Sequence, residues 1–140
     1  MTKVIFLKIP DRYSYGMEQI GIKQTTPLHQ DWLRRLDFYH FELFILQEQL
    51  EEIAEETTDG NILEKAGYFK SRIIIRKNHI EKLRNVVREN ELLLTSEMMY
   101  EDAIENTLAI FDTLNNECQA QQQAVNALRK EFDLFVAKCA

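Results

Sequence analysis

The most chemically suggestive spacing in this sequence is a carboxylate followed three residues later by an imidazole, Asp37 and His40. Di-metal carboxylate bundles use a Glu-x-x-His pair on two helices and one further carboxylate from each of two others, all pointing inward. Here the spacing occurs once, and neither residue falls on the expected core line of its helix. His79 has no acid three residues before it, and His29 falls where a lone histidine is usually a packed or capping residue. The sequence therefore predicts no metal site and no cofactor.

Nucleophilic catalysis has no better support in the sequence. It contains no Gly-x-Ser-x-Gly elbow, no Gly-rich phosphate loop and no Cys-x-x-Cys pair. Cys118 and Cys139 lie on one expected helix, about 31 Å of rise apart, so they cannot pair within the chain. We interpret them as free thiols that pack as small apolar groups, with a disulfide between chains as the alternative. We predict that the protein is not an enzyme.

The element that would position all of these residues is a long amphipathic helix over residues 27–57. Its apolar residues recur at alternating gaps of four and three, which keeps them on one side of an α-helix. Thr26 suits the N-cap and Pro27 the first helical position, where a missing N–H costs nothing. The line consists of Trp32, Leu36, Tyr39, Leu43, Leu46, Leu50 and Ile53.

Two further helices continue the same pattern, over residues 61–93 and 97–139. Asn61, with Glu64 three residues on, predicts the cap of the second helix at the end of a turn over residues 57–61. No Gly or Pro forces a turn after Val87, so a continuous helix and an open, chain-exchanged dimer remain the alternative. The second core line is Ile62, Ala66, Phe69, Ile73, Ile80, Leu83 and Val87. The third helix has two lines, Ile104, Phe111, Cys118, Val125, Phe132 and Cys139, and Tyr100, Thr107, Leu114, Gln121, Leu128 and Phe135.

Polar residues interrupt these lines at two places. Arg76 occupies a core position of the second helix, and antiparallel pairing would put it level with Glu42 of the first. We predict a buried or half-buried Arg76–Glu42 ion pair that fixes the helix register. In the third helix the stretch from Asn115 to Gln123 is polar, which predicts a place where the helix bends, protrudes or meets a polar partner.

The first helix also has a second apolar side, away from its core line. Phe38, Phe41, Phe44 and Ile45 lie there, and a three-helix bundle leaves this side uncovered. A contiguous apolar stripe of this kind indicates an interface. Its cover could be the apolar N-terminal arm, residues 1–26, a second subunit, or a different protein.

The charge distribution argues against nucleic acid or an anionic membrane as the default partner. The formal net charge is −6. Residues 61–94 carry eight bases and four acids, whereas residues 27–58 carry eight acids and two bases. We expect the basic middle helix to attract its acidic neighbours. No apolar run reaches the ~20 residues of a membrane span, and residues 1–10 do not form a secretory signal, so we expect a cytoplasmic protein.

Three stretches resemble a family of small bacterial helical-bundle proteins with no assigned function. They are residues 32–50, residues 69–83 with Ile73-Ile74-Ile75, and residues 128–138. The resemblance implies the bundle fold and a bacterial cytosolic origin, and it transfers no catalytic residue. Because the motifs are packing residues, they say little about function.

The sequence as a whole predicts an all-α antiparallel three-helix bundle with long coiled-coil-like helices and an N-terminal extended arm. We predict a homodimer with a non-enzymatic structural or protein-interaction role, carried by the first helix. The alternative is a small-ligand or metal-binding bundle that uses buried polar groups such as Arg76, Glu42 and His29.

Overall fold

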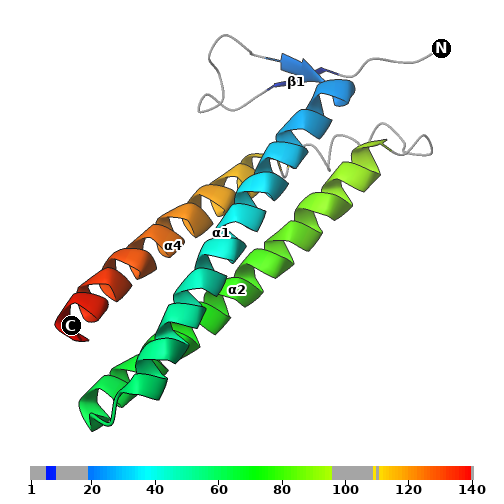
Figure 1. The fold of residues 1–140 in the computed structure, drawn as a ribbon. Helices are drawn as coiled ribbons and strands as arrows, with labels where there is room; N and C mark the ends of the chain where they lie inside the picture. The colour runs from blue at the N-terminus through cyan, green and yellow to red at the C-terminus, as the bar shows by residue number, and fades with distance from the viewer. Residues whose placement is uncertain (1–5, 9–18, 96–108, 110, 140) are drawn as a thin grey trace. The chain divides into compact units, whose positions relative to one another are not determined.

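A computed structural model describes residues 6–8, 19–95, 109 and 111–139 of the chain. Three long helices dominate it, α1 (Ile22–Glu56), α2 (Gly60–Thr95) and α4 (Phe111–Cys139) (Figure 1). They pack against one another as an all-α three-helix bundle, which confirms the predicted fold class. The described residues fall into two compact units, the first made of those within 1–35 and 83–118 and the second of those within 36–82 and 119–140.

The core of each helix follows the predicted lines. On α1 the side chains of Trp32, Leu36, Tyr39, Leu43, Leu46 and Leu50 are buried, and Ile53 is half-buried. On α2 the predicted line is buried from Ala66 to Val87, apart from half-buried Arg76, while Ile62 at its start is half-buried. These regular periods, rather than helix propensity alone, select the packed face of each helix.

The start of α1 differs from the prediction. The helix begins at Ile22, directly after a short strand, so Thr26 is not its cap and Pro27 lies inside it. A proline at the sixth helical position removes one backbone hydrogen bond, which the sequence pattern did not anticipate. Pro27 lies beyond the first four N–H groups, which have no helical partner in any case, so its missing N–H is a hydrogen bond lost from the second turn of α1.

The turn between α1 and α2 is capped by a different residue from the one predicted. The backbone N–H of Asn61 donates to Asp59 Oδ1 at 2.9 Å, and the N–H of Leu63 donates to the Asp59 carbonyl at 3.0 Å. The N–H of Asp59 itself donates to Thr57 Oγ1 at 3.2 Å. Asp59 is therefore the N-cap of α2, and the predicted cap at Asn61 is wrong. The negative charge of the Asp59 carboxylate is also favourable at the positive end of the helix dipole.

Helix α4 reverses direction against α2 and closes the bundle. The Phe69 ring of α2 packs edge-on to Phe132 at 5.6 Å between centroids, and lies 5.2 Å from Phe135. These contacts within one chain favour the closed bundle over the open, chain-exchanged alternative. The predicted third helix is present over 111–139. Its first part, with Tyr100, Ile104 and Thr107, lies outside the described residues.

A small ribbon precedes the bundle. Strand β1 (Phe6–Lys8) pairs antiparallel with β2 (Gln19–Gly21), with Leu7 opposite Ile20. The predicted N-terminal arm, residues 1–26, is thus extended at residues 6–8 and 19–21. How the side chains of residues 1–26 pack lies outside the described part of the chain. Among the described helices, none combines the length and the apolar character that a membrane span requires.

Candidate functional site

The most exposed apolar surface of α1 is the side opposite its core. Phe38 is 56% exposed, Phe41 58%, Phe44 46% and Ile45 39%. Residues 38, 41 and 45 repeat at gaps of three and four, so they form one stripe along the helix. Leu36, Leu43 and Leu46 are buried on the other side, which fixes the orientation of the stripe toward solvent. We call these four residues, Phe38, Phe41, Phe44 and Ile45, the α1 stripe.

One ring of the α1 stripe packs beside a core residue of the same helix. The Phe38 ring lies 6.0 Å from the ring of buried Tyr39, in an edge-on arrangement. Exposed acids border the stripe, with Asp37 at one end and Glu48 at the other. An apolar centre with a charged border is the anatomy of a protein-interaction patch.

The two residues of the predicted ion pair have different partners in the structure. Glu42 accepts a hydrogen bond from Arg129 Nη1 of α4 at 2.8 Å. Arg76 donates from Nη1 to Gln121 Oε1 of α4 at 3.1 Å. Within the described residues, the structure therefore does not bring Glu42 and Arg76 together as an ion pair. The prediction considered only the pairing of the first two helices, whereas both residues face α4.

A second polar contact between α2 and α4 was not anticipated from the sequence. The Arg72 guanidinium donates to Tyr68 Oη at 3.0 Å and to the carboxylate of Glu131. The hydrogen bond to Glu131 raises the pKa of Arg72 above its ordinary value. This contact is one instance of the expected attraction between the basic second helix and an acidic neighbour.

His40, which follows Asp37 by three residues, lies near a carboxylate of another helix. Its Nε2 lies 3.3 Å from Glu81 Oε1 on α2, without the geometry of a hydrogen bond. No group of three or more His, Cys, Asp or Glu side chains in the described part of the chain is placed to hold a metal ion.

His29 is a packed core residue, one of the two roles that the sequence indicated for it. It is fully buried, and its Nε2 lies 2.6 Å from Oδ1 of buried Asn90 on α2. With the amide oxygen as acceptor, the imidazole donates from Nε2. The rings of Trp32 and Phe111 pack edge-on against it, at 5.6 and 5.1 Å between centroids. Sequence reasoning missed Asn90, although it lies three residues after Val87, in step with the α2 core line.

Both cysteines are free thiols in the structure. Cys118 is buried, and that burial raises the pKa of its thiol to about 12. The nearby Arg35 guanidinium opposes the rise without cancelling it. Because the thiolate is the reactive form, Cys118 is inert at neutral pH. Cys139 is half-buried near the end of α4.

Comparison of the chain with protein-family models, with curated proteins and with solved structures finds no match. The resemblance to small bacterial helical-bundle proteins therefore stays a prediction. Function must be argued from the surfaces of the bundle.

Proposed function

We propose that this protein is a non-enzymatic interaction module that associates with a second copy of itself through the α1 stripe. The observation that carries the proposal is the exposure of three phenylalanines and one isoleucine, 39–58% each, within eight residues of one helix. Large aromatic side chains dominate the binding energy of protein interfaces, because they bury much area at low entropic cost. In water these rings are exposed at a free-energy cost that burial against a partner would remove.

A second copy is the simplest partner for this surface. A two-fold contact places the same patch on both sides, so an apolar stripe is complementary to itself. The border acids, Asp37 and Glu48, remain in solvent at the rim of such a contact, where charges cost little.

The size of the α1 stripe sets the expected affinity. Four partly exposed side chains bury roughly 300 Å² per subunit, based on the area of an aromatic side chain. Stable interfaces usually bury about 800 Å² per partner. The proposed dimer is therefore weak, with a dissociation constant in roughly the micromolar range.

The test compares two variants with the same change in charge by sedimentation velocity of the full chain. Phe41→Glu places a carboxylate in the centre of the stripe and should shift the protein to monomer. Ile75→Glu places one on α2, where Ile75 is 52% exposed, and should leave the dimer intact. If the two variants have the same oligomeric state, the α1 stripe is not the interface.

The competing function is a small-ligand or metal-binding bundle that uses buried polar groups. His29 is the residue that supports it best, because its buried Nδ1 has no hydrogen-bond partner among the described residues. The aromatic rings packed around the imidazole favour a structural role. Metal analysis of the purified protein separates the two functions, since a stoichiometric transition metal would contradict the interaction module.

A further inference from the structure

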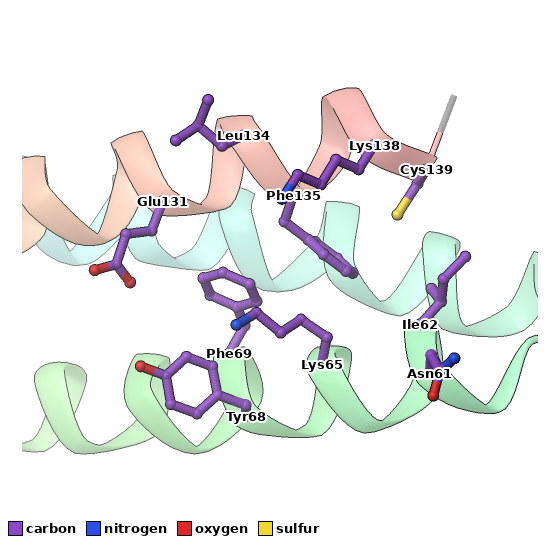
Figure 2. A pocket seen from close by; sticks show the side chains of 10 residues that line it. All are labelled: Asn61, Ile62, Lys65, Tyr68, Phe69, Glu131, Leu134, Phe135, Lys138 and Cys139. Carbon is purple, nitrogen blue, oxygen red and sulfur yellow. The ribbon is translucent and has the colours of Figure 1, made fainter.

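A groove lies on the surface between the first turns of α2 and the last turns of α4. Its volume is about 500 Å³, and it opens to solvent. Figure 2 shows Phe69 and Phe135 facing each other between the two helices, with Lys65 beside them. The volume falls within the roughly 300–1,000 Å³ typical of sites for small molecules.

The floor of this groove is aromatic and preformed. Phe69 is 1% exposed and Phe135 7%, and each is packed against the other and against Phe132. Beside this floor Tyr68 and Leu134 remain largely exposed, so apolar surface continues toward the rim. A rigid apolar floor binds an apolar group without having to reorder first.

The lining of the groove carries more positive than negative charge. The Lys65 ammonium lies 4.8 Å from the centroid of the Tyr68 ring and 5.8 Å from that of Phe69. Lys138, on the other helix, is exposed at the rim. Neither lysine has an acidic partner among the described residues, whereas the acid of the lining, Glu131, is bound by Arg72. The groove thus presents two available cations in a chain whose net charge is −6.

We propose that this groove binds a monocarboxylate with an extended apolar body, a ligand of the fatty-acid class. The alkyl chain would lie along the exposed side chains of Tyr68 and Leu134, above the buried rings of Phe69 and Phe135, and the carboxylate would pair with Lys65 and Lys138. A cationic amphiphile is disfavoured because the lysines repel it, and a neutral one leaves their charge unused. This site goes beyond the proposed self-association, uses none of the residues of the α1 stripe, and does not depend on it.

The binding test is calorimetric titration of the full chain with sodium decanoate below its micelle concentration. We expect one decanoate per chain and no comparable binding of decyltrimethylammonium. The double variant Lys65→Gln/Lys138→Gln should weaken decanoate binding about tenfold. Its matched control is Lys70→Gln/Lys130→Gln, which removes two exposed lysines from the same helices outside the groove and should leave the affinity unchanged.

A second readout places the ligand in the groove. The Cys139 thiol lines it, so bound decanoate should slow the reaction of Cys139 with a thiol reagent. The Cys139→Ser variant identifies that signal, because Cys118 is buried. No binding, equal binding to both double variants, or tight binding of decyltrimethylammonium would each overturn the proposal. A monomeric wild-type protein would contradict the α1 interface and leave this result unaffected.

Discussion

Arg76 of α2 and Gln121 of α4 satisfy each other in the interior of the bundle, with Arg76 Nη1 donating to Gln121 Oε1 at 3.1 Å. Both residues are half-buried and interrupt otherwise apolar core lines. The two polar residues therefore lie in the same layer of the bundle. They can pair in this way only when α2 and α4 are aligned in the observed register. Buried polar pairs of this kind specify geometry more than they add stability.

This pairing predicts a strong coupling between the two positions. Gln121→Leu should destabilise the protein by about 1–2 kcal/mol, because it leaves the Arg76 guanidinium half-buried without its acceptor. The double variant Arg76→Leu/Gln121→Leu should be as stable as the wild type or more so. Urea unfolding of the four proteins in this cycle measures the coupling. Additive effects would mean that the contact contributes nothing.

The α1 core makes a second prediction. Leu43 is fully buried, so Leu43→Ala should lower the free energy of unfolding by about 2–5 kcal/mol. The control is Gln49→Ala, an exposed position on the same helix that should change stability by less than about 0.5 kcal/mol. Chemical denaturation gives both values, and a neutral Leu43→Ala would show that the other face of α1 is buried.

The sequence predicted those features that repeat within one helix. The seven-residue periods of Leu36, Leu43 and Leu50 identified the buried face of α1, and the exposed α1 stripe follows from the same pattern. The cap of α2 was missed because Asp59 and Asn61 are both residue types that suit an N-cap, and the cap of α1 was missed because that helix begins at Ile22, before Thr26. Arg72–Glu131 was missed because it joins residues 59 apart in sequence, and no local pattern fixes how α2 and α4 align.

The buried His29–Asn90 contact predicts an asymmetric effect of two similar substitutions. Asn90→Leu should destabilise the protein by about 1–3 kcal/mol, because it removes the hydrogen-bond acceptor of a fully buried imidazole. Asn85→Leu, at an exposed position of the same helix, serves as the control and should have little effect. Thermal unfolding at constant pH compares the two. Equal stabilities would show that the contact is energetically neutral.

The raised pKa of Cys118 predicts a loss of stability at alkaline pH. The folded state holds the thiol protonated to about pH 12, whereas an exposed thiol ionises near 9.0. The unfolded state therefore loses its proton first, so the contribution of Cys118 is complete below pH 9 and falls as the pH rises toward 12. The slope is at most about 1.4 kcal/mol per pH unit.

Comparison with the variant Cys118→Val isolates this effect. Tyrosines and lysines titrate in the same pH range, but their contributions are the same in both proteins and cancel in the difference between the two free energies of unfolding. Urea unfolding between pH 8 and 10.5 should show the wild type losing stability faster than the variant above pH 9. Parallel curves for the two proteins would contradict the burial of the thiol.

In the proposed homodimer, the α1 stripe joins two copies of the chain. The most direct measurement is the molar mass of the full-length protein by light scattering across a dilution series that spans the micromolar range. We predict a mass that approaches twice 16.6 kDa at high concentration and falls toward 16.6 kDa on dilution. A mass of 16.6 kDa at every concentration would contradict self-association through Phe38, Phe41, Phe44 and Ile45.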